Sequence, residues 1–260
     1  MLKLNLMVMA GTSDARKMIK KLSLTGNYIL ATAISLNGGE LAKQAGADKV
    51  LVGRFDSAKL AEIIKDNEVD VLIDATHPFA SDATRNAIKA TEKEKIRYIR
   101  FDRPTLDIPD NELIHKVNNF GEAVEEIVKL GDSRILHLAG VMTLHHLTGR
   151  IYPHRIVARI LPTTFSIEKC QEAGIPPQNI VAMQGTYSKE FNQALMKEYD
   201  IKVVVTKESG KSGGTPSKLQ AALELGIHIV MVMRPEVDEL KGKTVYNNMD
   251  DVVEEIKKLE

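Results

Sequence analysis

Short apolar runs of strand length alternate with helical patterns along the whole chain. After the first run and a glycine turn, apolar residues recur at the spacing of one helix face, at Ala15, Met18, Ile19 and Leu22. The runs that predict strands are Leu4–Met9, Tyr28–Ala33, Lys49–Val52, Asp70–Ile73, Arg97–Phe101, Arg134–Leu138, Arg155–Leu161, Ile180–Met183, Lys202–Val205 and His228–Met233. Strands with near-continuous apolar character are covered on both faces, so the pattern predicts an α/β fold with mostly parallel sheets.

The chain also repeats itself. Val117–Leu130 and Tyr246–Leu259 share Asn-Asn and Val-Glu-Glu-Ile, and an Arg-Pro pair follows a predicted strand in each part of the chain. The repeat predicts two similar halves, residues 1–130 and 131–260, with a last helix that can pack back on the first half. The alternative is a single repetitive α/β sheet, which would also bind ligands at the carboxyl ends of its strands.

Composition narrows the class of protein. Acidic and basic residues balance at 35 each, so no overall field attracts nucleic acid or an anionic membrane, and we expect neither partner. The only cysteine, Cys170, excludes an internal disulfide framework and a Cys-based zinc site. No apolar run approaches the roughly 18 residues that span a bilayer, and the N-terminus lacks a signal-peptide pattern. We therefore expect a cytoplasmic protein, whose oligomeric state the sequence leaves unknown.

Three predicted loops carry the candidate chemistry, because backbone N–H groups are available where helices begin beyond the carboxyl ends of parallel strands. In the first loop, Ala10–Arg16, Gly11 permits a tight turn close to a ligand, and Ser13 or Asp14 can cap the next helix. Backbone N–H groups and the hydroxyls of Thr12 and Ser13 could hold a phosphate. The loop lacks the full Gly-x-Gly-x-x-Gly fingerprint, so a plain capped turn is the alternative.

The second loop, Asp74–Ala80, places an acid, a hydroxyl and an imidazole directly after a buried strand. Pro78 shapes its turn. A lone histidine is more often structural than catalytic. An exposed Thr-His-Pro at the end of a strand is harder to explain by packing, so this pattern favours a functional site.

The third loop, Thr206–Pro216, contains glycines and hydroxyls directly before a helix. Its Gly-Lys-Ser sequence at Lys211 is not a P-loop, because the first glycine of that motif is missing upstream. The loop is still suited to a phosphate or to carboxylates at a helix N-terminus. The alternative is a flexible, solvated loop.

Four histidines invite a metal hypothesis: His137, His145, His146 and His154. Their spacing matches no common ligand pattern, and no cysteine or acidic residue joins them. We predict no metal site.

The three loops, in this order and spacing, resemble the precorrin-6A reductase family of vitamin B12 biosynthesis. The strings that match are Gly11-Thr12-Ser13 with Ala15-Arg16, Asp74–Ala80, and Val205–Gly210 with Gly213-Gly214. Two further strings, Ala158–Pro162 and Gly174–Gly185, resemble the branch that acts on the cobalt-containing intermediate. The resemblance runs essentially from end to end, but Leu138–Met142 lacks a Thr-Gly pair that many members carry.

The resemblance implies two Rossmann-like domains with mostly parallel sheets and an active site in the cleft between them. It also implies reduction of one carbon–carbon double bond of precorrin-6A, or of its cobalt form, to precorrin-6B by NADPH or NADH. The nicotinamide would supply the hydride, and the protein would position it against a large polycarboxylate macrocycle.

Candidate roles follow from the loops together with the resemblance. The proton that accompanies the hydride has four unranked candidate donors: His77, Lys207, Glu208 and Tyr187. The predicted cofactor-binding residues are Gly11, Thr12, Ser13, Arg16, Thr76, His77, Pro78, Ser209, Gly210 and Gly213. The residues predicted to bind substrate carboxylates are Arg159, Lys207 and Lys211.

The choice between NADPH and NADH depends on the end of the second strand. Tyr28–Ala33 is followed by Ile34-Ser35-Leu36-Asn37, without the acidic residue that grips the ribose of NAD. This absence favours NADPH. No arginine for a 2′-phosphate stands there either, so NADH remains an alternative.

Two other classes of function compete with the reductase. One is a non-catalytic, two-lobed module that binds a nucleotide or a carboxylate. The other is a methyltransferase or isomerase that acts on similar tetrapyrroles, for which binding of S-adenosylmethionine without a response to NADPH would be evidence.

Overall fold

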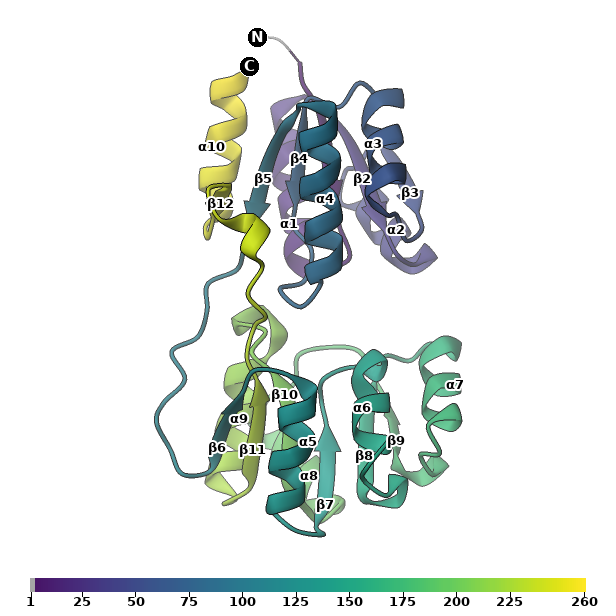
Figure 1. Ribbon diagram of the computed structural model, residues 1–260, viewed down its shortest axis with the longest axis vertical. Coiled ribbons are helices and arrows are strands. Elements are labelled where there is room, and N and C mark those ends of the chain that lie inside the picture. The colour runs from purple at the N-terminus through teal and green to yellow at the C-terminus, as the bar shows by residue number, and fades with distance from the viewer. Residues whose placement is uncertain (1–2) are drawn as a thin grey trace. The chain divides into compact units, whose positions relative to one another are not determined.

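The computed structural model describes residues 3–260, apart from the side chain of Ser212. The chain divides into two compact units (Figure 1). Unit 1 extends to Pro104 and resumes from Glu236 to Glu260, and unit 2 is Thr105–Pro235. Each unit is built on its own six-stranded sheet.

Unit 1 has strands in the order β12-β5-β4-β1-β2-β3, and all neighbouring strands are parallel. Its elements are β1 (Asn5–Met9), α1 (Ser13–Leu22), η1 (Ser23–Thr25), β2 (Tyr28–Ala33), α2 (Leu36–Gln44), β3 (Lys49–Val52), α3 (Ser57–Asp66), β4 (Val71–Asp74), α4 (Ser81–Glu94), β5 (Arg97–Phe101), η6 (Asp238–Leu240), β12 (Thr244–Tyr246) and α10 (Met249–Leu259). From the β3 edge this is the order of a doubly wound dinucleotide-binding fold, whose switch point lies between β1 and β4.

Unit 2 has strands in the order β6-β11-β10-β7-β8-β9, again all parallel. Its elements are β6 (Ile114–Val117), α5 (Phe120–Lys129), β7 (Arg134–His137), η2 (Val141–Thr143), α6 (Leu144–Thr148), η3 (Pro153–Arg155), β8 (Ile156–Ile160), α7 (Thr164–Glu172), η4 (Pro177–Asn179), β9 (Ile180–Ala182), α8 (Lys189–Glu198), β10 (Ile201–Lys207), η5 (Lys211–Gly213), α9 (Thr215–Glu224) and β11 (His228–Val232). The two sheets therefore share one topology, as the repeat predicts.

The sixth strand of each sheet comes from the other half of the chain. β6 pairs with β11 and completes unit 2, whereas β12 pairs with β5 and completes unit 1. The observed units thus differ from the predicted halves, 1–130 and 131–260, because the repeated strand–helix segment closes the open edge of the other sheet. The last helix does pack back on the first unit, where Val252 and Ile256 are fully buried.

The core of unit 1 lies on both faces of its sheet. Successive residues of β1 point to opposite faces, so Leu6 and Val8 pack under α1 and α10 while Met7 and Met9 pack under α3 and α4. The apolar stripe predicted at Ala15–Leu22 is the buried face of α1. Coverage on both faces explains the continuous apolar character of the strands.

The edge strands β6 and β12 are the elements that the apolar pattern does not predict. Each is short and has polar or exposed residues, since an edge strand of a covered sheet is only partly buried. β10 is longer than predicted and continues through Lys207, so the third loop begins at Glu208.

The parallel sheets determine where the candidate loops lie. Within one sheet, the carboxyl ends of all strands share an edge. The first and second loops therefore lie together in unit 1, and the third loop lies at the corresponding edge of unit 2. No helix formed by residues 3–260 is both long enough and apolar enough to cross a bilayer.

Candidate active site

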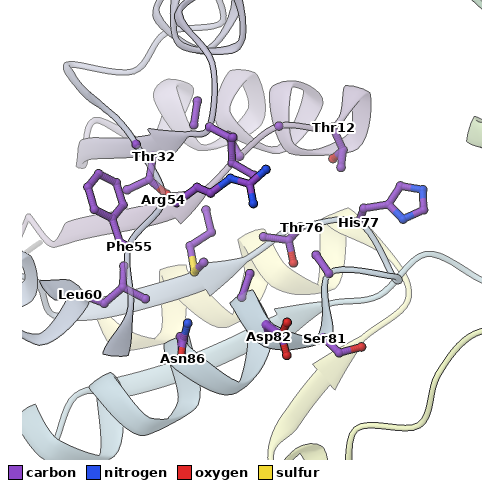
Figure 2. A pocket seen from close by; sticks show the side chains of 18 of the residues that line it. Thr12, Thr32, Arg54, Phe55, Leu60, Thr76, His77, Ser81, Asp82 and Asn86 are labelled. Carbon is purple, nitrogen blue, oxygen red and sulfur yellow. The ribbon is translucent and has the colours of Figure 1, made fainter. Parts of the chain in front are cut away.

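A pocket of about 520 Å³ lies at the carboxyl edge of the sheet in unit 1 (Figure 2). The ends of β1 to β4 and the start of α4 line it. Of the predicted cofactor-binding residues, Gly11, Thr12, Thr76 and His77 line the pocket. Ser13, Arg16 and Pro78 belong to the same loops but are not in its lining.

The turn after β1 is built for close approach of a ligand. Gly11 has φ 118°, which side chains disfavour, and no atom lies within 4 Å of where its Cβ would be. Thr12, rather than Ser13 or Asp14, caps α1: its hydroxyl accepts from the backbone N–H of Ala15 at 3.0 Å. The same hydroxyl donates to the carbonyl of Ala75 at 3.1 Å and so joins the first loop to the second.

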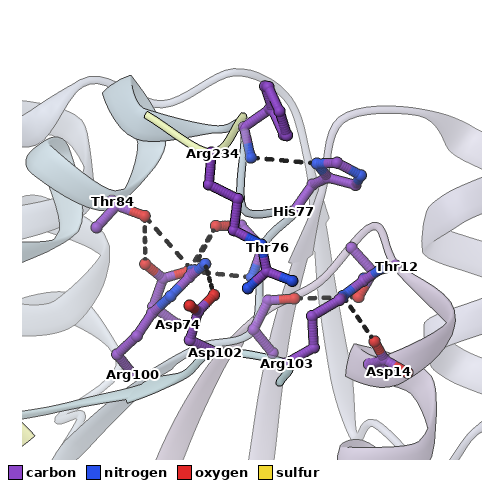
Figure 3. A network of polar contacts seen from close by, with 12 residues as sticks. Thr12, Asp14, Asp74, Thr76, His77, Thr84, Arg100, Asp102, Arg103 and Arg234 are labelled. Carbon is purple, nitrogen blue, oxygen red and sulfur yellow. Dashed lines mark hydrogen bonds and ion pairs between the residues drawn. The ribbon is translucent and has the colours of Figure 1, made fainter. Parts of the chain in front are cut away.

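A fully buried carboxylate, Asp74, organises the second loop (Figure 3). Arg100 Nη1 lies 2.8 Å from Asp74 Oδ1, which also accepts the backbone N–H and hydroxyl of Thr76 at 3.0 and 2.7 Å. Oδ2 accepts the hydroxyls of Thr84 and Tyr98 at 2.7 and 3.0 Å. Burial acts to raise the pKa of Asp74, but Arg100 and these hydrogen bonds hold it below its ordinary value. Asp74 is therefore an ionised structural anchor.

Asp74 positions the two residues that follow it in the pocket wall. The Thr76 hydroxyl donates to Asp74 and accepts from Arg100 Nη1 at 3.0 Å, so its orientation is set from both sides. His77 Nδ1 accepts the backbone N–H of Phe79 at 3.2 Å, which leaves the proton of the neutral imidazole on Nε2.

Arg54 and Phe55 complete the pocket wall, and the sequence reasoning missed both. They lie in the loop between β3 and α3, and the Arg54 side chain reaches into the pocket (Figure 2). Among residues 3–260, no carboxylate forms an ion pair with Arg54. The signal that could have revealed it is topological: β3 pairs with β2, so a basic residue after β3 stands beside the end of β2.

In unit 2, Glu208 holds the start of the third loop. Its side chain is 1% exposed, forms an ion pair with Arg234, and accepts the backbone N–H groups of Gly210 and Leu106 at 3.1 and 3.3 Å. A carboxylate that accepts from this many donors anchors a loop. These contacts therefore support a positioning role for Glu208 rather than the role of proton donor.

The remainder of the third loop is compact. The Ser209 and Thr215 hydroxyls lie 3.2 Å apart, and a Cβ on Gly213 would collide with the Ser209 hydroxyl. Gly213 is thus required by packing. Gly210 is followed by a single 3₁₀ turn that begins at Lys211, and this turn leads directly into α9.

Lys207 and His137 lie near one another at the ends of β10 and β7. Burial lowers the pKa of Lys207 to about 8, and its ammonium lies 5.5 Å from the centre of the Phe120 ring. Burial, followed by the charge of Lys207, lowers the pKa of His137 to about 4. His137 is therefore neutral at pH 7, and its Nε2 lies 3.2 Å from the Thr143 hydroxyl.

Tyr187 and Arg159 form a separate group in unit 2. The guanidinium of Arg159 lies 5.3 Å from the centre of the Tyr187 ring and donates to Asn192 Oδ1 at 2.9 Å. Tyr187 also stacks on Phe191, with 4.7 Å between ring centres.

The histidines do not converge on a metal. His137 is buried on β7, the rings of His145 and His146 in α6 are tilted against one another, and His154 stacks on Tyr152. Across residues 3–260, no group of three or more His, Cys, Asp or Glu side chains is placed to bind a metal ion.

Comparison with known proteins identifies the family. A family model described as precorrin-6x reductase CbiJ/CobK matches residues 5–257. A cobalt-precorrin-6A reductase of Methanothermobacter thermautotrophicus is 45% identical over 260 residues, covering 99% of this chain and 85% of the relative. This chain belongs to the precorrin-6x reductase family.

Further comparisons agree with this assignment. A cobalt-precorrin-6A reductase of Priestia megaterium is 37% identical over 251 residues, covering 95% of this chain and 96% of the relative. The solved structure of a CobK precorrin-6A reductase has the same fold, with a TM-score of 0.80 and 20% identity, covering 99% of this chain and 97% of that one. Membership of the precorrin-6x reductase family favours an oxidoreductase over the binding module and the methyltransferase or isomerase.

The buried ion pair of this reductase gives a prediction on stability. Arg100→Met leaves the Asp74 carboxylate buried without its cation, so the free energy of unfolding at pH 7 should fall by about 3–5 kcal/mol. The matched control, Arg97→Met on the same strand, removes the exposed cation of a pair with the partly buried Glu255 and should cost clearly less, about 1 kcal/mol. Urea denaturation measures both, and equal losses would contradict the anchoring role of Asp74.

The buried His137 gives a prediction on pH dependence. The pKa of His137 in the folded state, about 4, lies below the ordinary 6.5. Between these two pH values, His137 is therefore protonated in the unfolded chain and neutral in the folded chain. This contribution to stability is present above pH 6.5 and is lost as the pH falls toward 4; it amounts to about 2 kcal/mol between pH 7 and 5. The loss of stability in urea between these pH values should be smaller by that amount in His137→Gln. An unchanged difference would show that His137 is not buried in the neutral form.

Proposed function

We propose that this protein is an NADPH-dependent cobalt-precorrin-6A reductase that binds its cofactor in the pocket of unit 1. The observation that carries the cofactor assignment is the turn at Gly11 and Thr12, at the N-terminus of α1 and the switch point of the sheet. Pyrophosphate groups bind at such helix N-termini, where backbone N–H groups and the helix dipole meet a negative charge. The open space beside Gly11 is the space that a Cβ would fill, so the turn fits a diphosphate.

Arg54 supports NADPH over NADH. Its side chain extends into the pocket beside the end of β2, where the adenosine ribose lies in dinucleotide-binding folds. An arginine without a carboxylate partner in the described chain is suited to the 2′-phosphate of NADPH, which it can bind through paired, charge-assisted hydrogen bonds. Phe55 adds an apolar surface in the same wall, against which the adenine can pack.

The remaining pocket residues serve orientation. When bound, the nicotinamide supplies the hydride that reduces a carbon–carbon double bond of the macrocycle. The hydrogen bonds of the Thr76 hydroxyl with Asp74 and Arg100 fix this side chain in the pocket wall that faces the cofactor. His77 Nε2–H offers a donor whose direction is set by the hydrogen bond at Nδ1. A fixed arrangement of this kind reduces the entropy lost in aligning two reactants.

Of the four candidate proton donors, Lys207 is best suited. A group with a pKa near the working pH is protonated in useful amount and gives up its proton readily, and burial brings the pKa of Lys207 to about 8. Glu208 is occupied by Arg234 and by two backbone N–H groups. We therefore assign proton delivery to Lys207 and positioning of its loop to Glu208.

Substitution of Arg54 tests the cofactor assignment. Arg54→Met should raise the Kd for NADPH about tenfold to a hundredfold and leave that for NADH unchanged, because only NADPH carries the 2′-phosphate. Lys59→Met, which removes an exposed cation of α3 outside the pocket lining, is the control and should change neither. Fluorescence titration measures the affinities, and an equal effect on both cofactors would refute the role of Arg54.

Wild-type turnover tests the reaction itself. The purified protein should oxidise NADPH only when cobalt-precorrin-6A is added, as followed by the loss of nicotinamide absorbance. Cofactor binding without oxidation in the presence of this substrate would count against the proposed activity.

Substitution of Lys207 tests proton delivery. Lys207→Met should lower kcat about a hundredfold or more, while the Kd for NADPH stays constant. In the wild type, kcat should fall as the pH rises through about 8, where Lys207 loses its proton, and this limb should be absent in the variant. Lys202→Met, an exposed lysine at the start of β10, is the control. A variant with full kcat would exclude Lys207 as the donor.

A further inference from the structure

Two cations in unit 2, Arg159 and Lys218, are largely withdrawn from solvent without a carboxylate beside them. Arg159 lies near the carboxyl end of β8, on the face where Val157 packs under α8 and α9. Lys218 lies in the first turn of α9. Both therefore stand at the carboxyl edge of the sheet, above the core that these two helices cover.

The contacts of the two cations are all with neutral groups. Arg159 donates to the side-chain oxygen of Asn192 and lies over the Tyr187 ring, whereas Lys218 Nζ donates to the carbonyl of Gly213 at 2.8 Å. No Asp or Glu among residues 3–260 forms an ion pair with either one. The pKa values agree: burial lowers that of Arg159, and burial together with Arg159 lowers that of Lys218 to about 8.

The surrounding helices add positive charge. Asn192 and Lys218 belong to the first turns of α8 and α9, whose N-termini carry partial positive charges. α9 has no acidic residue in its first turn and no side-chain cap. The N-terminus of α8 is capped by Ser188 and has the exposed Glu190 in its first turn. The two cations and the N-terminus of α9 have no such counter-charge among residues 3–260, which is unfavourable in a site with little water. An anion bound between them would relieve this repulsion.

The loop after β9 is fixed beside the cations. The Ser217 hydroxyl donates to the carbonyl of Tyr187 at 2.9 Å, and Asn192 Nδ2 donates to the carbonyl of Ser188 at 2.7 Å. Thr186 lies against Gly214, where a Cβ would come within 3.3 Å of the threonine methyl group. The loops after β9 and β10 and the end of β8 therefore form one frame around the two cations.

We propose that Arg159 and Lys218 form a carboxylate subsite that binds an acidic side chain of the macrocyclic substrate. The identity of the ligand rests on the proposed function, because the substrate of that reaction is a polycarboxylate. The guanidinium of Arg159 can donate two parallel hydrogen bonds to one carboxylate, and the ammonium of Lys218 adds a second positive charge. The sequence suggested Arg159 for this role, whereas Lys218 is identified only by the fold.

Uroporphyrin, a tetrapyrrole with acetate and propionate side chains, is the probe for this subsite. Its binding to the whole protein without cofactor is measured by fluorescence quenching at pH 7. Lys218→Gln, which can still donate to the Gly213 carbonyl, and Arg159→Gln should each weaken binding at least about tenfold. Lys218→Arg keeps the charge and should stay within about threefold of the wild type. Lys202→Gln removes an exposed lysine of the same unit and should have no effect.

Several outcomes overturn the subsite. It fails if the wild type does not bind uroporphyrin, if both Gln variants bind it as tightly as the wild type, or if Lys202→Gln weakens binding equally. Circular dichroism confirms folding, and Arg159→Met is the substitute if Arg159→Gln does not fold. A parallel titration with NADP separates the two anion sources: a loss of NADP affinity as large as the loss of uroporphyrin affinity would assign the cations to a cofactor phosphate and overturn the carboxylate proposal. If the wild type bound uroporphyrin through Lys218 but did not bind NADPH, the proposed function would fail while the subsite stood.

Discussion

The parallel pairing of β1 with β2 on one side and β4 on the other is the constraint on which the proposed cofactor site depends. It places the ends of three strands at one edge and leaves the backbone N–H groups at the start of α1 available to a ligand. The buried pair of Asp74 and Arg100 then fixes the loop after β4, and the Thr12 hydroxyl joins this loop to the turn after β1. The pocket exists because the sheet holds these loops apart and in register. Since the chain has no net charge, the positive potential in the pocket comes from helix N-termini and single side chains.

The two units show how one topology serves different chemistry. In unit 1 the switch point holds a glycine turn and a helix of three turns' length that begins with a threonine cap. In unit 2 the corresponding turn at Gly140 leads into a single 3₁₀ turn and the five-residue helix α6, and buried His137 and Lys207 lie beside it. The exchange of the last strand and helix also makes each unit depend on both halves of the chain, so neither half can complete its sheet from its own residues.

The strand–helix alternation, the internal repeat and the three loops could all be predicted from the sequence, because apolar periodicity and glycine turns are local signals. The family was also predicted, from strings such as Asp74–Ala80. That β6 and β12 each join the sheet formed by the other half of the chain could not be predicted, since a short edge strand carries no sequence signal for its partner strand. Arg54 and Lys218 were missed for a related reason: each is unremarkable in its own segment, and its significance comes from neighbours that only the sheet order and helix packing bring near.

The central claim is that the dinucleotide binds across the strand ends of unit 1, and a crystal structure of the protein grown with NADP tests it most directly. We expect the diphosphate within hydrogen-bond distance of the backbone N–H groups of Thr12 and Ser13, with the 2′-phosphate on the Arg54 guanidinium. NADP bound instead to the turn at Gly140 in unit 2, or bound in unit 1 with its adenosine remote from Arg54, would contradict it.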